Sequence, residues 1–345
     1  MIKGRGTSIN SHNRFDKNQY VPDEGERLED AGVPSTKIIE INAKSIVNQV
    51  NSPDVPLSWS MNPYQGCEHG CTYCYARETH QYWGYSGGVD FENVILVKKD
   101  AASLLKKKFQ SPSWKGEGIM LSGNTDCYQP IERKLKITRG LLEVCRTHKN
   151  PVGIITKNSL VTRDIDILQE MAKDQLTYVV LSITSLDDSL RRILEPRTAS
   201  VKSKLQTIEK LSEAGIPVGV MMAPIIPALN SHEIMDMANT VSRAGATVLR
   251  HTIVRLNGCV EELFSDWLER HFPDRKKKIL MHIADCHGGS LQDSRFKTRM
   301  SGEGNYANMI KQQFKIATKK YNLNNERFSL NETLFSKTGQ LGLGL

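Results

Sequence analysis

The chain has 345 residues, of which 39% are hydrophobic, and it carries a formal net charge of +8. This length can bury the core of one large domain or of two ordinary ones. No apolar stretch approaches the roughly 20 residues of a membrane span, and no hydrophobic region follows the charged start Met1–Gly6. We therefore expect neither a membrane anchor nor a secretion signal, and we place the protein in the cytoplasm.

Charge and cysteine content narrow the functional classes. The seven cysteines form an odd set and three of them crowd together, which argues against a disulfide framework and for a reducing compartment. The positive charge is compatible with an anionic partner such as nucleic acid. The lysine runs Lys106–Lys108 and Lys276–Lys278 are, however, equally typical of solvated helix faces.

The first segment of the chain has little periodicity. Residues 1–36 are polar, and we expect an extended arm that wraps the surface or is partly disordered. Alternation in Ile39–Asn42 predicts a half-buried strand, and a second strand near Leu57–Tyr64 leads into a cysteine-rich loop.

That loop contains Cys67, Cys71 and Cys74 in the spacing C-x3-C-x2-C. Thiolates spaced in this way can all turn onto one small inorganic group, and a cubane 4Fe–4S cluster suits them best. Three ligands leave one iron without a protein ligand. An open coordination position is typical of a reacting metal centre rather than a structural one.

After the cysteines, strand-like and helix-like segments alternate. The strand-like runs are continuously apolar, which predicts strands covered on both faces, and the helices between them require parallel pairing. With the strand before the cysteines this gives six units, so we predict an α/β fold: a partial (β/α)6 TIM-type barrel with an N-terminal arm and a C-terminal α-rich extension. The expected strands lie at 118–121, 152–156, 178–183, 217–222 and 247–250, and the helices at 137–148, 163–173, 200–214, 231–243 and 261–271. The expected domains are the arm (1–50), the barrel (51–272) and the extension (273–345).

Small, polar or rigid residues follow successive strands of the predicted barrel. In such barrels the chemistry gathers at the carboxyl ends of the strands. Singly, each segment has an ordinary explanation: an Asx turn, a solvated lysine, a helix cap, a surface ion pair or a strand end. Together they predict a ligand site. The segments are Ser122-Gly123-Asn124-Thr125-Asp126, Thr156-Lys157, Ser182-Ile183-Thr184, Glu195-Pro196-Arg197 and Ala223-Pro224.

These features resemble the radical S-adenosylmethionine (SAM) superfamily, and within it the spore photoproduct lyase group and its uncharacterised relatives, often called DNA-repair-photolyase-like. The resemblance runs from Asn62 to Pro227, and the cysteine motif is its most specific part. It implies a 4Fe–4S cluster on Cys67, Cys71 and Cys74, with SAM chelating the open iron. The residues that it implies around SAM are Tyr73, Ser122, Gly123, Asn124, Thr125, Asp126, Lys157, Ser182, Thr184, Arg197 and Pro224.

The resemblance also implies roles and an activity. Asn124–Asp126 would face the SAM amine, whereas Lys157, Ser182 and Arg197 would contact its carboxylate or ribose. An electron from a reductase or from a flavodoxin- or ferredoxin-type donor would cleave SAM to methionine and a 5′-deoxyadenosyl radical, which takes hydrogen from a substrate. The sequence does not identify that substrate: nucleic acid is one candidate, and a protein or a small molecule is an equal one.

One position departs from the spore photoproduct lyase pattern. Those enzymes carry a hydrogen-donating cysteine where this chain has Ser122, and a serine O–H bond is too strong to quench a carbon radical. Cys127, on the other side of the segment, is our candidate catalytic residue, and a buried core thiol is the alternative. Repair of the spore photoproduct itself is therefore not expected unless Cys127 has taken over the role.

Two other classes of protein could carry the cysteine motif. A nucleic-acid-binding module would hold a structural zinc on the three cysteines with His69 or His80. A simple electron-transfer protein would usually show a fourth cysteine ligand and a shorter chain.

The last third of the chain is rich in turns and charges. Segments such as Gly288–Ser290 and Arg299–Gly304 predict a lid over the open side of the barrel, and a surface tail with one amphipathic helix at 306–320 is the alternative. His282, Cys286 and His287 lie close in sequence, but no second C-x2-C accompanies them, so we expect no second cluster.

Overall fold

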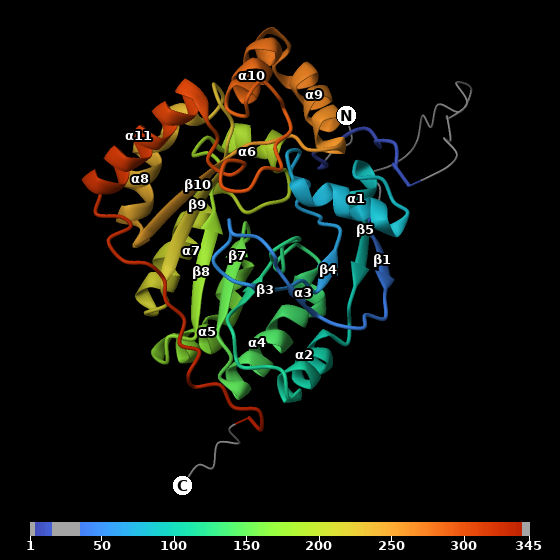
Figure 1. Cartoon of the computed structure of the whole chain (residues 1–345), viewed down its shortest axis with the longest axis vertical. Coiled ribbons are helices and arrows are strands. Elements are labelled where there is room, and N and C mark those ends of the chain that lie inside the picture. Colours follow the sequence, from blue (N-terminus) through green and yellow to red (C-terminus); the bar gives the residue numbers. More distant parts are fainter. Residues whose placement is uncertain (1–3, 16–34, 340–345) are drawn as a thin grey trace.

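A computed structural model describes residues 4–15 and 35–339 of the chain. In these residues the main sheet has seven strands in the order β10-β9-β8-β7-β6-β3-β2 (Figure 1). All neighbours pair in parallel except β2, which is antiparallel to β3. Six parallel strands in chain order confirm the predicted partial barrel. The strands are β2 (Val47–Gln49), β3 (Trp59–Met61), β6 (Ile119–Leu121), β7 (Val152–Thr156), β8 (Thr177–Ser182), β9 (Val218–Ile225) and β10 (Val248–Ile253).

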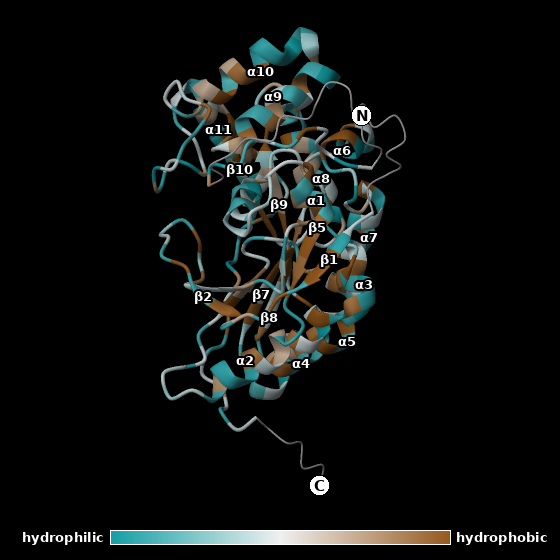
Figure 2. Cartoon of the chain, turned by 90° about the vertical axis from the view of Figure 1, so that its right-hand side faces the viewer, coloured by the Kyte–Doolittle hydropathy of each residue, from teal (hydrophilic) through white to brown (hydrophobic). Residues whose placement is uncertain are grey.

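The strands are the apolar centre of the molecule, as the brown core of Figure 2 shows. Every residue of β8 is buried, which is what its continuous apolar run predicted. In β6 and β9 the neighbours of Met120 and Met221 belong to the main hydrophobic core, whereas these two methionines are half-buried. The second face of the sheet is thus the more accessible one.

Helices follow the strands, and each predicted helix is present with its ends shifted by a few residues. The predicted helix 137–148 coincides with α4. No helix in residues 4–15 and 35–339 is long and apolar enough to cross a membrane. The longer helices are α2 (Ala101–Gln110), α4 (Ile137–His148), α5 (Ile165–Lys173), α7 (Val201–Glu213), α8 (Ile234–Arg243), α9 (Cys259–His271), α10 (Pro273–Asp285) and α11 (Gly304–Lys320), and the short ones are η1 (Tyr75–Trp83), α1 (Val89–Asn93), α3 (Glu132–Leu135), η2 (Ser159–Asp164), α6 (Asp188–Leu194) and η3 (Ser231–Glu233).

A second, small sheet was not predicted. It consists of β1 (Lys37–Glu40), β5 (Val94–Val97) and β4 (Tyr64–Gln65), in the order β1-β5-β4. The single strand expected near 57–64 is divided between β3 and β4, and Pro63, which lacks a backbone N–H, stands just before β4. The division turns the chain out of the main sheet directly before the cysteines.

The segment between α10 and α11 runs over the carboxyl ends of the strands. The amide of Leu256 donates to Leu291 O, and the amide of Ile253 donates to Met300 O, each at 2.8 Å. Arg299 reaches Asp54, in the loop between β2 and β3, at 2.6 Å. Because β10 and β2 are opposite edges of the sheet, this strap spans the open side where we predicted a lid.

The segment after α11 runs across the amino-terminal ends of the strands instead. Side chains and backbone amides of this segment contact residues in or just before β10, β8 and β6. The segment therefore covers the amino-terminal base of the partial barrel. These contacts join Asn324 to Leu249, Asn331 to Gln175, Glu332 to Gly118 and the ring of Phe328 to Tyr178.

His251 on β10 makes the stability of this edge sensitive to pH. Its ring stacks on Phe314 of α11, and burial, followed by the charges of Lys311 and Arg250, lowers its pKa to about 4 from 6.5. The unfolded chain therefore takes up this proton first as the pH falls. We expect the free energy of unfolding to drop by roughly 1–2 kcal/mol between pH 6.5 and 4 on account of this residue.

Urea unfolding at several pH values checks the expectation. The variant His251→Phe should lose that part of the slope, while the exposed-site control His232→Gln should keep it. Equal slopes in the wild type and His251→Phe would contradict the assignment.

Candidate active site

The cysteine loop lies between β4 and η1, where the chain leaves the carboxyl end of β3. Cys67 and Cys71 are buried and Cys74 is half-buried, and all three are free thiols. The amide of Cys67 donates to Phe91 O at 2.8 Å. Gly70 has φ +68°, and a Cβ atom there would come within 2.7 Å of the Glu92 carboxylate. The loop is therefore closely packed against α1.

A fully buried ion pair, Arg77 with Glu92, supports the cysteine loop. Arg77 on η1 donates through Nε to Cys71 O at 2.9 Å and through a terminal nitrogen to Glu92 at 2.6 Å. The same carboxylate accepts the backbone amides of Gly6 (2.9 Å) and Thr7 (3.1 Å). Residues 4–15 of the predicted arm are thus a structural support of the cysteine loop, with several buried residues, rather than a surface segment alone.

The three thiols come from one short loop and lie near enough to influence one another's pKa. Burial raises the pKa of Cys71 well above its usual value and that of Cys74 to about 11, and the neighbouring cysteines of the motif raise both further. Protonated thiols in such a site lose their protons when they bind a metal. Three free, desolvated thiols from one short loop have the chemistry of the donor set that a thiolate-bound iron–sulfur cluster needs.

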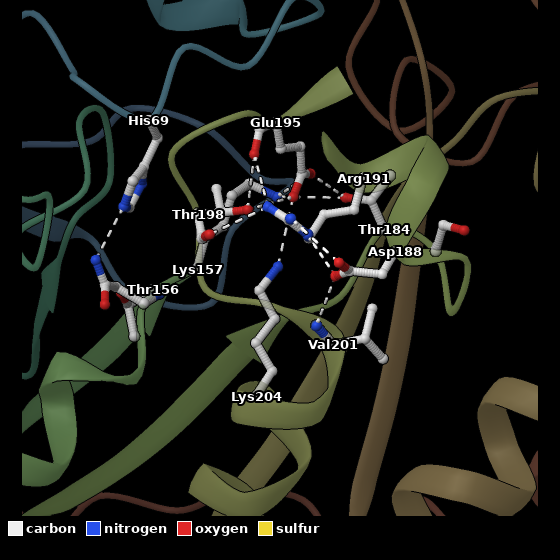
Figure 3. Close-up of polar contacts among 12 residues, drawn as sticks. His69, Thr156, Lys157, Thr184, Asp188, Arg191, Glu195, Thr198, Val201 and Lys204 are labelled. Atoms are coloured by element: carbon white, nitrogen blue, oxygen red, sulfur yellow. Dashed lines mark hydrogen bonds and ion pairs between the residues drawn. The ribbon is translucent and has the colours of Figure 1, made fainter. Parts of the chain in front are cut away.

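Glu195 is the centre of a polar cluster next to the loop (Figure 3). Its buried carboxylate accepts from the hydroxyls of Tyr73 and Thr184 and pairs with Lys157 at 3.0 Å and Lys204 at 3.4 Å. Burial would raise the pKa of Glu195, but the two ammonium groups and the two hydroxyls hold it well below its usual range. One carboxylate faces two lysines, so the cluster carries an excess positive charge, and Lys157 is the more exposed of the two.

Asp126 connects the ends of β6 and β7. Its carboxylate accepts from the Thr156 hydroxyl (2.8 Å) and the Lys157 amide (2.7 Å) and lies 3.4 Å from Nδ1 of His69. Burial alone would lower the pKa of His69, yet Asp126 and Cys67 raise it to about 10. The structure thus joins three of the predicted segments through this carboxylate. Contact of Asp126 with SAM stays a prediction.

The turn after β6 has a strained start. Ser122 has φ +74°, and its hydroxyl accepts the amide of Cys127 at 2.7 Å. Cys127 is completely buried in the main core, and burial raises the pKa of its thiol well above the usual value. This position suits the core-thiol alternative, and a part in hydrogen transfer stays a prediction.

The other predicted SAM residues lie around the same end of the sheet. The Tyr75 hydroxyl donates to Gly123 O at 2.6 Å. Ser182 ends β8 beside Met221 of β9. Arg197 does not point freely into the site, because it pairs with Glu68 of the cysteine loop at 3.0 Å. The remaining contacts are those of Asn124 with Asn62, Gln65 and Thr79, of Thr125 with Tyr64 O, and of Pro224 O with Asn230.

Several residues of the site were not predicted. Glu195, Lys204, Arg77 and Glu92 all have buried charges, and each has partners outside its own segment. Glu195 stood in a noted tripeptide, but only its arginine was considered. The position of Lys204 four residues into a helix carries no signal that its ammonium is buried, so the pattern could not have revealed it.

The histidines considered for other metals have protein partners. His80 packs between Tyr85 and Phe91, and His69 lies between Asp126 and Asn158. His287 uses both ring nitrogens, toward Asp293 (3.1 Å) and Val254 O (2.8 Å). Across residues 4–15 and 35–339, no three His, Cys, Asp or Glu side chains are arranged as ligands of one metal ion.

Comparisons with known proteins found relatives of similar sequence and a solved structure of similar fold. The uncharacterized protein Rv2578c of Mycobacterium tuberculosis is 33% identical over 238 residues, which are 68% of this chain and 70% of that protein. The uncharacterized protein MJ0683 of Methanocaldococcus jannaschii is 28% identical over 238 residues, 69% of this chain and 85% of that protein. The fold is similar to that of spore photoproduct lyase complexed with dinucleoside spore photoproduct, with a TM-score of 0.56 at 15% identity over 82% of this chain and 79% of the lyase.

The profile of the Radical SAM superfamily matches residues 61–241. This range begins in β3 and ends in α8, and it contains the cysteine loop, the Glu195 cluster and the strand ends that carry the predicted SAM residues. The chain belongs to the radical SAM superfamily, as its cysteine motif predicted, and is an enzyme of radical chemistry.

Proposed function

We propose that this enzyme holds a 4Fe–4S cluster on Cys67, Cys71 and Cys74 and uses SAM to abstract hydrogen from a substrate in the mouth of the partial barrel. The observation that supports this most is the position of the three free thiols in one loop beside the Glu195 cluster, at the carboxyl end of the parallel sheet. When bound, the cluster and SAM supply a 5′-deoxyadenosyl radical.

The residues of the chain would bind and orient this chemistry. Lys157 reaches the site from the end of β7, and its ammonium lies between Glu195 (3.0 Å) and Ala223 O (3.4 Å). The excess positive charge of the cluster suits the SAM carboxylate, and Lys157 is the lysine that can reach it. Lys204 would keep Glu195 neutralised while Lys157 turns to the ligand.

We propose a supporting role for Arg197 in place of the SAM contact that the resemblance implied. Because Arg197 pairs with Glu68 and its amide donates to His69 O at 3.3 Å, we assign it to holding the cysteine loop against the loop between α6 and α7. Contact with SAM would require this arginine to leave a carboxylate that is itself buried.

The substrate is part of the proposal and not of the family assignment. Nucleic acid is our first candidate, supported by the net charge of +8 and by the fold shared with a lyase solved with a dinucleoside photoproduct. A flavodoxin- or ferredoxin-type protein is the proposed electron donor.

Anaerobic reconstitution with iron and sulfide, followed by incubation with reductant and SAM, tests the function. We expect brown protein and release of 5′-deoxyadenosine, with a rate or product pattern that changes when DNA is added. Colourless protein that retains zinc would favour the zinc-module alternative. Release of 5′-deoxyadenosine that DNA leaves unchanged would refute the nucleic-acid candidate alone.

A further inference from the structure

Arg255 stands at the same end of the sheet as the proposed SAM residues. It lies two residues beyond the end of β10, and the preceding amide, of Val254, donates to Ile225 O at the end of β9 at 2.9 Å. The carboxyl ends of parallel strands meet at one edge. The guanidinium of Arg255 is therefore near the mouth of the partial barrel, under the strap.

This arginine has polar contacts but no carboxylate partner. One terminal nitrogen donates to Arg299 O and to Sδ of Met300, both at 3.2 Å. Among residues 4–15 and 35–339 no Asp or Glu forms an ion pair with it. The side chain is half-buried, and burial followed by the charge of Arg299 lowers its pKa. A partly desolvated charge without a counter-ion is unfavourable unless a ligand supplies one.

The acidic groups nearest to Arg255 are engaged elsewhere. Asp54 accepts from Nε of Arg299 at 2.6 Å and from the Lys297 amide at 2.7 Å. Asp293 pairs with Arg295 at 2.9 Å and with His287 at 3.1 Å. Both carboxylates act on Arg255 from a distance, but each is already neutralised by another arginine, so neither is a direct counter-ion of Arg255.

Tyr75, the first residue of η1, lies near Arg255. Tyr75 follows Cys74 directly, its hydroxyl donates to Gly123 O, and the residue is 54% exposed. Tyr75 and Arg255 are close enough for the arginine charge to act on the phenol. A molecule held by Arg255 would thus lie against Tyr75, next to the proposed cluster and to the turn after β6.

We propose that Arg255 binds an oxyanion of the substrate, a phosphate or a carboxylate, and so fixes the substrate in the mouth of the barrel. The planar fork of a guanidinium matches two oxygen atoms of either group. The assignment rests on the proposed function, because that function places the reacting part of the substrate at this end of the sheet.

Calorimetric titration of the reconstituted protein with inorganic phosphate and with acetate, at constant ionic strength, tests the site. We expect the variant Arg255→Gln to bind the preferred anion roughly tenfold or more weakly than the wild type. The control Arg146→Gln removes a surface arginine that pairs with Glu170 on the helical layer, and it should bind as the wild type does. Tighter binding of phosphate would indicate a phosphorylated substrate, and tighter binding of acetate a carboxylate.

The possible results test the anion site at Arg255 separately from the proposed function. An unchanged dissociation constant in Arg255→Gln, or no binding of either anion to the wild type, would overturn the anion site even if the protein is brown and cleaves SAM. Colourless wild-type protein that loses anion binding in Arg255→Gln would overturn the proposed function and leave the site standing. The variant Arg255→Lys keeps the charge without the fork, so its dissociation constant for the anion should lie between those of the wild type and Arg255→Gln. This result would show that the loss in Arg255→Gln is not caused by misfolding.

Discussion

Replacing Cys71 with alanine is expected to remove the brown colour and the cleavage of SAM together. Loss of a residue that only supports a metal ligand lowers metal affinity or activity roughly 10- to 100-fold, and loss of a ligand should exceed that range. The backbone of Cys71 is held by Arg77, so the loop keeps its anchor in the variant. Iron content, visible absorbance and 5′-deoxyadenosine release measure the effect.

Two other cysteines provide the controls for this experiment. Cys145→Ala removes a fully buried thiol from α4, and it should lower stability by about 1 kcal/mol while keeping iron and activity. Cys127→Ala should also keep iron, and a change in its products would support the hydrogen-transfer role. A Cys71→Ala variant that retains both iron and SAM cleavage would exclude the cluster from this loop.

The substitution Glu195→Gln should destabilise the protein by roughly 3–5 kcal/mol, because it leaves the buried ammonium of Lys204 and the half-buried ammonium of Lys157 without a carboxylate. The carboxylate has a depressed pKa, so its contribution is present at neutral pH and is lost as the pH falls below the ordinary value of about 4.5. Urea unfolding at pH 7 measures the difference in the free energy of unfolding.

A double-mutant cycle shows whether the lysines cause this cost. Lys204→Met alone leaves Glu195 paired with Lys157, and Lys204→Met in the Glu195→Gln background removes one unpaired ammonium. We therefore expect the double variant to be more stable than the sum of the single changes predicts, by about 1–3 kcal/mol. Additive effects would mean that the two side chains stabilise the protein independently.

Much of the main sheet was predictable because its strands and helices are local patterns. The apolar runs that became β7, β8 and β9 are mostly buried, and helical spacing alone placed α4. The small sheet was not predictable, since β4 has two residues and its partner β5 pairs with β1 more than 50 residues earlier. Such short strands are defined by their partners and not by their own composition.

Local sequence patterns predicted only part of the candidate site. Tyr73, Lys157 and Thr184 were predicted from the motif and from strand ends, and they do converge. The carboxylate that joins them, Glu195, lies in a loop, where an exposed ion pair was as good an interpretation. Its complete burial follows from the packing of segments that are far apart in the sequence, which no local pattern expresses.

The covered base of the barrel has a consequence for how the chain folds. The amide of Gly118, before β6, meets the carboxylate of Glu332 across 214 residues of sequence, and the ring of Phe328 packs on Tyr178. During synthesis the β6–β9 part of the sheet can form while its amino-terminal edge is still uncovered, and that edge is protected only after residues 324–336 have emerged. Contacts of such long range form late and slowly. The nascent sheet thus passes through a period in which its base is open to aggregation or to a chaperone.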